Sequence, residues 1–162
     1  MTENALKLKL LVYGIAALVI GIPAFFIARD LLTSVEVGEC ARPSASSDGG
    51  FDMTETDCTS ADASYRLVKL EQRRSCPSGD YLTQTERKAG RSGGSKQFCY
   101  VLNVREGDCL KRSEAFHERV ACGAGATQRV SKVSAGDDRA LCGGAEARTY
   151  PDPATTICLE NV

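Results

Sequence analysis

Tryptophan is absent from this sequence, histidine occurs once, and no two cysteines stand at C-x-x-C spacing. Aromatic residues make up only 6% of the 162 residues, which leaves little material for a large hydrophobic core. The formal net charge is −1, so no strong overall field attracts nucleic acid or acidic ligands. These absences argue against a nucleic-acid-binding protein and turn attention to the cysteines.

The chain has eight cysteines, and the closest pair, Cys99 and Cys109, is separated by ten positions. A thioredoxin-like redox motif and a zinc site both need more closely spaced pairs, so we expect no redox activity, no metal ligand and no cofactor. A short chain with this many cysteines is typical of a protein stapled by disulfides in an oxidising compartment. The eight predicted disulfide cysteines are Cys40, Cys58, Cys76, Cys99, Cys109, Cys122, Cys142 and Cys158.

Catalytic candidates are few. A Ser-His-Asp or Cys-His arrangement would have to use His117, the one histidine. It stands in EAFHERV among charged residues, with no G-x-S-x-G motif nearby, and we interpret it as a solvated or partly packed surface residue. The acidic stretch at 48–57 lacks the spacing of an EF-hand, and we interpret it as a solvated loop. No catalytic residue is therefore predicted.

A basic, glycine-rich stretch occupies residues 86–96, with the sequence ERKAGRSGGSK. We interpret it as a flexible hairpin loop, and the alternative is a contact with anionic lipid headgroups or wall polymers. No aromatic residues interleave with its basic ones, which argues against nucleic-acid binding.

An uncharged apolar run extends from Leu10 to Ala28, a length of about 28 Å as a helix and close to the hydrocarbon thickness of a bilayer. Lys7 and Lys9 precede it, which places the N-terminus in the cytoplasm. We predict a cytoplasmic tail at 1–9, a transmembrane signal anchor at 10–28, a juxtamembrane segment at 29–34 and an extracytoplasmic remainder. A cleaved signal peptide is the alternative, but the run is long and no A-x-A-like site comes after it.

Small residues recur along one face of this predicted helix and would allow a second helix to approach closely. A partner in the membrane is the interpretation that we favour, although glycine and alanine are also common in membrane helices generally. The predicted helix-association face consists of Gly14, Ala17, Gly21 and Ala24.

An internal repeat divides the rest of the chain. The stretch SVEVGEC at 34–40 returns as NVREGDC at 103–109, and each opens a series of four cysteines in similar local settings. Such self-similarity predicts tandem modules at 35–103 and 104–162. No Gly/Ser linker separates Cys99 from Cys109, so we expect a relatively rigid pair.

Short runs rich in β-branched residues, aromatics and leucine predict strands at 65–70, 97–104, 127–133 and 155–162. Residues 113–119 could form one helical turn, with Ser113 as its cap. We expect three to five strands in each module. The predicted fold is one N-terminal transmembrane helix followed by two tandem small β-rich, disulfide-stapled modules.

Eight cysteines allow 105 pairings, but only three are possible within each four-cysteine module. We favour joining the first cysteine of a module to the second, and the third to the fourth. A first-to-fourth, second-to-third order would also close a small sandwich and stays open. The favoured bonds are Cys40–Cys58, Cys76–Cys99, Cys109–Cys122 and Cys142–Cys158.

The G-[DE]-C opening, the CPSGDY segment at 76–81 and the closing FCYVL strand at 98–102 resemble the LppU-type small envelope proteins of actinobacteria and, more weakly, the septum-formation domain. The resemblance covers 35–103 better than 104–162. It implies an extracytoplasmic module held at the membrane, here by a helix because no lipobox is present, and it brings no catalytic residues.

From these features we expect a non-catalytic, membrane-anchored binding or accessory-subunit protein of the bacterial cell envelope. Its partners would be the membrane and a membrane or envelope protein, with an unknown ligand. The alternatives are an extracytoplasmic enzyme that acts on envelope material and a sensor that needs a partner transmembrane helix.

Overall fold

The computed structural model describes residues 35–47, 49–72, 74–87, 94–123 and 125–162. Within these ranges no helix has the length and apolar character needed to cross a membrane. The predicted anchor at 10–28 and its association face at Gly14, Ala17, Gly21 and Ala24 lie outside the described residues. Residues Glu36–Val162 form one compact unit, and the division into modules at 35–103 and 104–162 stays a prediction.

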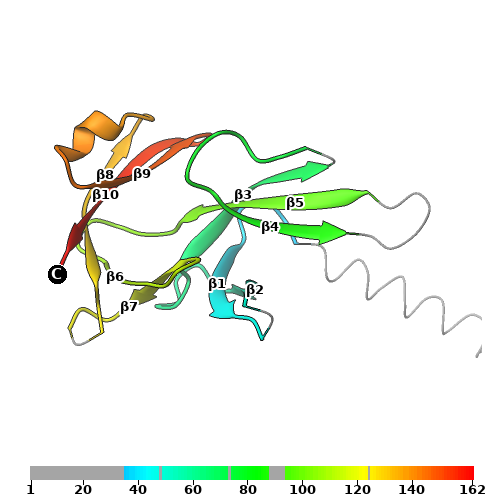
Figure 1. Ribbon diagram of the computed structural model, residues 1–162, viewed down its shortest axis with the longest axis horizontal. Coiled ribbons are helices and arrows are strands. Elements are labelled where there is room, and N and C mark those ends of the chain that lie inside the picture. Colours follow the sequence, from blue (N-terminus) through cyan, green and yellow to red (C-terminus); the bar gives the residue numbers. More distant parts are fainter. Residues whose placement is uncertain (1–34, 48, 73, 88–93, 124) are drawn as a thin grey trace, which may run out of the picture. The chain divides into compact units, whose positions relative to one another are not determined.

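Two antiparallel five-stranded sheets make up this unit (Figure 1). The first contains β1 (Cys40–Ala45), β2 (Phe51–Thr56), β3 (Tyr65–Gln72), β4 (Leu82–Arg87) and β5 (Ser95–Leu102). The second contains β6 (Cys109–Arg112), β7 (His117–Val120), β8 (Gln128–Ala135), β9 (Glu146–Pro151) and β10 (Ala154–Asn161). The strand orders, β2-β1-β3-β5-β4 and β7-β6-β8-β10-β9, are the same topology used twice. The β-rich, disulfide-bonded part of the predicted fold is confirmed.

The four predicted strands correspond to β3 and β8, the central strands of the two sheets, and to β5 and β10, which pair with them. The predicted helical turn at 113–119 is wrong. Those residues form the hairpin between β6 and β7, in which Arg112 pairs with His117 and the Ser113 N–H donates to the Phe116 carbonyl at 2.8 Å. Phe116 is buried against the edge of the Phe51 ring, and this packing overrides the local helical tendency. The one helix among the described residues is the 3-10 turn η1 (Arg139–Cys142).

The repeated G-[DE]-C motif forms a turn that leads into β1 in the first sheet and into β6 in the second sheet. Gly38 has a φ of +106°, a conformation that favours glycine, and its N–H donates to the Leu67 carbonyl of β3 at 2.7 Å. The carboxylate of Glu39 closes the turn by accepting the Glu36 N–H at 2.8 Å. The second copy repeats this geometry with Gly107, Val130, Asp108 and Arg105. The motif therefore positions β1 against β3 and β6 against β8.

A β-bulge also occurs at the same place in both sheets. Val68 is an extra residue of β3 relative to β5, and Ser131 is an extra residue of β8 relative to β10. Bulges bend a strand and redirect side chains. In the first sheet the redirected residue, Val68, lines a pocket between the two sheets.

Four disulfides, Cys40–Cys58, Cys76–Cys99, Cys109–Cys122 and Cys142–Cys158, join the cysteines in the order that the sequence analysis favoured. We call the part of the unit up to residue 103, which contains the first sheet, the first half, and residues 104–162, which contain the second sheet, the second half. The first disulfide of each half joins its first strand, β1 or β6, to the segment that follows the β1–β2 or β6–β7 hairpin. The second disulfide joins the connection between β3 and β4 to β5 in the first half, and the connection between β8 and β9 to β10 in the second half. Each half is thus closed separately, and no cysteine is left free.

The two sheets share one hydrophobic core, which contains Leu67 and Tyr100 from the first sheet and Val130 and Ile157 from the second. Polar contacts also join them. Asp80 and Thr149 exchange hydrogen bonds, from the Asp80 N–H to the Thr149 carbonyl at 2.9 Å and from the Thr149 N–H to the Asp80 carboxylate at 2.8 Å.

Gly79 fits closely at this junction. An added Cβ at this position would lie 2.9 Å from a side-chain atom of Pro151 and 3.0 Å from the Thr149 carbonyl. The backbone of the CPSGDY segment can therefore approach β9 because this residue has no side chain.

Candidate functional site

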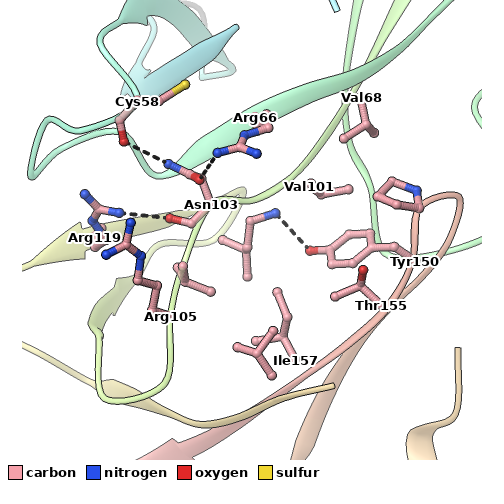
Figure 2. Close-up of a pocket in the computed structure, with 14 residues that line it drawn as sticks. Cys58, Arg66, Val68, Val101, Asn103, Arg105, Arg119, Tyr150, Thr155 and Ile157 are labelled. Atoms are coloured by element: carbon pink, nitrogen blue, oxygen red, sulfur yellow. Dashed lines mark hydrogen bonds between the residues drawn. The ribbon is translucent and has the colours of Figure 1, made fainter. Parts of the chain in front are cut away.

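A pocket of about 320 Å³ lies between the two sheets (Figure 2). Its walls come from β3 and β5, from the connection at 103–105, from β7 and from β8 to β10. We call it the arginine pocket. Its lining residues are Cys58, Arg66, Val68, Val101, Leu102, Asn103, Val104, Arg105, Arg119, Val133, Tyr150, Pro153, Thr155 and Ile157.

The charge of this lining is one-sided, because it includes three arginines and no aspartate or glutamate. Arg66 is exposed, and among the described residues its guanidinium donates only to the Asn103 side-chain oxygen, at 3.2 Å. The exposed Arg105 guanidinium has no hydrogen bond or ion pair with any residue that the structure describes. The lining is therefore locally positive although the net charge of the chain is −1. From that net charge, the sequence analysis expected no strong attraction for acidic ligands.

Arg119 differs from the other two arginines because its hydrogen bonds hold the two halves together. Its Nε donates to the Ala61 carbonyl at 3.0 Å and its Nη1 to the Asn103 carbonyl at 3.0 Å, while Nη2 donates to the Ser60 carbonyl. Only 18% of its side chain is exposed, and the Asp108 carboxylate lies 4.0 Å away. This guanidinium is a structural clamp at the pocket wall.

Asn103 lies at the centre of the polar end of the pocket, and its side-chain and backbone groups are bonded. The side-chain nitrogen donates to the Ala63 carbonyl at 2.9 Å, and the backbone N–H donates to the Ser64 carbonyl at 2.8 Å. Its side-chain oxygen and backbone carbonyl accept from Arg66 and Arg119. Asn103 thereby fixes two of the three arginines.

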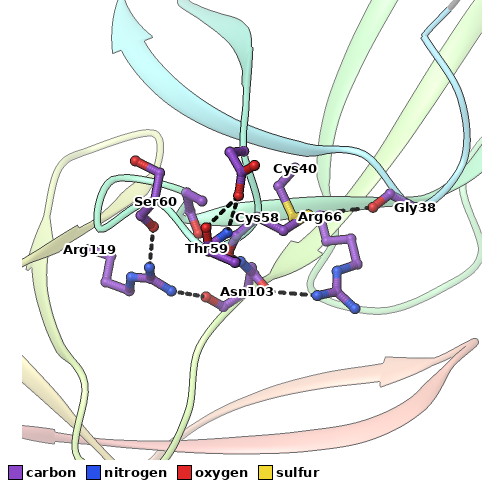
Figure 3. Close-up of a disulfide and its surroundings, with 10 residues drawn as sticks. Gly38, Cys40, Cys58, Thr59, Ser60, Arg66, Asn103 and Arg119 are labelled. Atoms are coloured by element: carbon purple, nitrogen blue, oxygen red, sulfur yellow. Dashed lines mark hydrogen bonds between the residues drawn. A yellow bond between two sulfur atoms is a disulfide. The ribbon is translucent and has the colours of Figure 1, made fainter.

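Asn103 and two of the Arg119 nitrogens donate to carbonyls of the segment at 57–64, which we call the 57–64 loop (Figure 3). The disulfide to the buried Cys40 holds Cys58 at its start. Asp57 also accepts the Thr59 N–H at 2.8 Å, and its bonds to Thr59 lower the pKa of its carboxyl. A covalent bond and a local turn therefore position the wall of the pocket.

The other end of the pocket is apolar. Val101 and Ile157 are buried there, beside Tyr150, which is 1% exposed. The Tyr150 hydroxyl accepts the Leu102 N–H at 3.3 Å. Figure 2 shows the arginines gathered around Asn103 and these apolar side chains towards the other side. An anionic group attached to an apolar side chain would match both ends.

The structure corrects the interpretation of His117, which is buried and only 6% exposed. Its backbone N–H donates to the Tyr65 hydroxyl at 2.8 Å, and the Arg119 N–H donates to the Ser64 hydroxyl at 2.8 Å. The first half thus covers the free edge of β7, an edge strand that pairs only with β6. A histidine among charged neighbours in the sequence becomes buried because another part of the chain covers it.

The pKa of His117 falls below its ordinary value of 6.5, chiefly because of burial and secondly because of the Arg148 charge. Since the unfolded chain keeps the ordinary value, it binds the proton more readily than the folded chain. Folded-state stability is therefore complete above pH 6.5 and is lost as the pH falls through the lowered pKa.

We expect the free energy of unfolding, measured with urea, to decrease as the pH is lowered from 6.5, by at most about 1.4 kcal/mol per pH unit. The decrease should be smaller in His117→Gln, which cannot take up the proton. Glu146 also has a lowered pKa, but the stability it contributes is lost below its ordinary value of 4.5, so the two effects separate. An identical pH dependence in wild type and His117→Gln would contradict the assignment.

The interpretation of the acidic stretch at 48–57 as a solvated loop is wrong, because Phe51–Thr56 forms β2, which pairs with β1. Within the described residues no three metal-binding side chains come together, and Asp57 of the acidic stretch is bonded to Thr59 instead. The basic stretch at 86–96 connects the paired strands β4 and β5, so it is a hairpin connection as predicted. Its tip at 88–93 lies outside the described residues.

In the comparison with known proteins, no family model, curated protein or solved structure matches the chain. Sequence reasoning missed Arg66, Asn103, Arg105 and Arg119. A signal for two of them was present in the repeat, where NVREGDC has Asn103 and Arg105 at the positions of Ser34 and Glu36 in SVEVGEC. The second copy thus exchanges an acidic residue for a basic one at the junction between the halves.

Proposed function

We propose that this protein is a membrane-anchored, extracytoplasmic binding or accessory protein of the cell envelope, and that its arginine pocket holds an acidic, apolar peptide segment of a partner protein. The observation that carries the proposal is the pocket lining, which has three arginines and no carboxylate above an apolar floor. An arginine guanidinium can bind a carboxylate with two parallel hydrogen bonds.

Arg105 and Arg66 are the groups that would bind the carboxylate, because Arg119 is already bonded to three carbonyls. The guanidinium of Arg105 is free of partners among the described residues, and that of Arg66 has only an amide oxygen as its acceptor. The apolar residues Val101 and Ile157 would contact the side chain next to the carboxylate.

A peptide suits this pocket better than a lipid. A volume of about 320 Å³ is at the lower end of the range for ligand pockets. It accommodates one or two apolar side chains rather than a pair of acyl chains. Anionic lipid is consequently an outcome to be distinguished by experiment.

The envelope location rests on separate features. Four disulfides are typical of an oxidising compartment. The apolar run at 10–28, preceded by Lys7 and Lys9, supports a single-pass anchor with residues 31–162 outside. The resemblance to LppU-type envelope proteins points the same way.

A defined peptide pair tests the pocket. The full chain in mild-detergent micelles would be titrated with a labelled short peptide that has one glutamate between leucines, and with the same peptide containing glutamine. We expect at least about tenfold tighter binding of the glutamate peptide, equivalent to about 1.4 kcal/mol, measured by fluorescence anisotropy. Arg105→Ser should remove this preference without changing thermal stability.

The matched control is Arg129→Ser. Arg129 is an exposed arginine on β8 that lies outside the pocket lining, so its loss should leave the preference intact. Equal binding of the two peptides by wild type would overturn the acidic-ligand proposal. Stronger binding to phosphatidylglycerol vesicles than to phosphatidylcholine vesicles, lost in Arg105→Ser and with no peptide binding, would replace the peptide by a lipid.

A further inference from the structure

A second cavity, of about 150 Å³, lies between the two sheets, and none of the four residues proposed to contact the peptide lines it. Tyr150 and Leu102 line both cavities. The remaining walls come from Tyr65 of β3, from the segment at 80–82, from the β6–β7 hairpin at 112–117 and from Arg148 of β9. We call it the tyrosine cavity.

Two buried hydroxyls on this cavity have protons left to donate. The Tyr65 hydroxyl accepts the His117 N–H, and the Tyr150 hydroxyl accepts the Leu102 N–H. Each phenol oxygen also has one proton of its own, and no acceptor for either proton occurs among the described residues. Both side chains are more than nine-tenths buried, at 3% and 1% exposure.

Both phenols remain protonated at any physiological pH. Burial raises the pKa of Tyr65 to about 12 and raises that of Tyr150 further. The Arg148 charge acts on the pKa of both hydroxyls in the opposite direction, and all three residues line the cavity. They are therefore donors rather than bases.

Two more polar atoms around this cavity lack partners. The Nε of Arg148 is buried with no hydrogen-bond partner among the described residues, although the guanidinium Nη2 donates to Glu146 at 2.7 Å. The Nε2 of the buried His117 is likewise without a partner. Buried polar groups are normally bonded, so the two phenol protons and the Arg148 Nε–H point to a ligand that accepts hydrogen bonds.

The charges around the cavity limit that ligand to a single negative charge. Arg112 and Arg148 are paired with Glu146, at 3.1 and 2.7 Å, Asp80 lies 3.9 Å from Arg148, and Glu114 also lines the cavity. A dianion such as phosphate would be repelled by these carboxylates. A single carboxylate would accept from the phenols and the free Nε without adding a second charge.

We propose that the tyrosine cavity binds a small monocarboxylate, whose oxygens accept hydrogen bonds from the hydroxyls of Tyr65 and Tyr150 and from the Nε of Arg148. The cavity volume of about 150 Å³ limits the ligand to a few non-hydrogen atoms. Its position at the junction of the two sheets means that binding would strengthen their association.

The single histidine gives a direct probe of this site. The full chain would be labelled with ¹³C in the imidazole of histidine and titrated in detergent micelles with acetate, acetamide and inorganic phosphate. We expect acetate to shift the His117 resonance saturably. Acetamide and phosphate should bind at least about tenfold more weakly, because acetamide has no negative charge and the phosphate dianion has two.

Two variants locate the effect. Tyr150→Phe removes only a hydroxyl, and Arg148→Gln removes the free Nε; both should weaken the acetate response at least about tenfold, whereas Arg129→Gln should leave it unchanged. If either cavity variant fails to fold, the wild-type comparison of the three ligands decides by itself. An absent or non-saturating acetate response, or an equal response to acetamide or phosphate, would overturn the proposal.

Discussion

Replacing Arg119 with alanine should destabilise the compact unit Glu36–Val162 by about 3–4 kcal/mol, a loss among the largest expected for any exchange outside the disulfides. The guanidinium donates to three carbonyls, those of Ser60, Ala61 and Asn103. A hydrogen bond to a charged donor is worth about 1.5–3 kcal/mol, but bonds from one group are not additive. The free energy of unfolding in urea, followed by tyrosine fluorescence, measures the loss.

Two matched variants separate geometry from charge. Arg119→Lys keeps the positive charge but cannot reproduce a planar fork with three acceptors, so we expect it to recover less than half of the loss. Arg129→Ala removes an exposed arginine with no hydrogen bond or ion pair among the described residues and should change stability by less than about 0.5 kcal/mol. Full recovery by lysine would show that charge, rather than the three-carbonyl clamp, is what the site needs.

The sequence predicted the interior of each sheet better than its edges. The stretches YRLVKL at 65–70 and TTICLENV at 155–162 combine β-branched and apolar residues because they pack in the shared core, and both are strands. The edge strands β2 (FDMTET) and β7 (HERV) are short and polar, so composition gave no basis for locating them. These two segments are strands because they pair with β1 and β6, and their own composition does not indicate it.

The disulfide order could be anticipated because the repeat reduces the problem to one small module. The arginine pocket could not, because it depends on contacts between distant segments. Arg66, Asn103 and Arg119 meet through Asn103 although they belong to β3, the connection and β7. The misinterpretation of His117 has the same cause, since the residue that covers it, Tyr65, is 52 positions away in the sequence.

The repeat also provides an internal control for the disulfides. Cys40–Cys58 and Cys109–Cys122 occupy the same place in their halves, with sequence separations of 18 and 13 residues. On the chain-entropy model, loops of this size are each worth about 3 kcal/mol, with a difference of only a few tenths. The segments after the second cysteine of each half differ in their contacts. The 57–64 loop bonds across to Arg119, whereas Thr127, after Cys122, bonds to Leu110 and Arg112 of its own half.

We therefore expect the double variant Cys40→Ala/Cys58→Ser to lose about 3 kcal/mol from its disulfide and a further 1–2 kcal/mol or so from the loosened carbonyl clamp. Cys109→Ala/Cys122→Ser should lose only the first amount. Urea unfolding of both variants under oxidising conditions gives the comparison. Adding Arg119→Ala to each should cost less in the Cys40→Ala/Cys58→Ser background than in the other, because the clamp is already weakened there. Equal losses in the two double variants would mean that the 57–64 loop holds its position without the disulfide, and that the pocket wall depends on Asn103 and Arg119 alone.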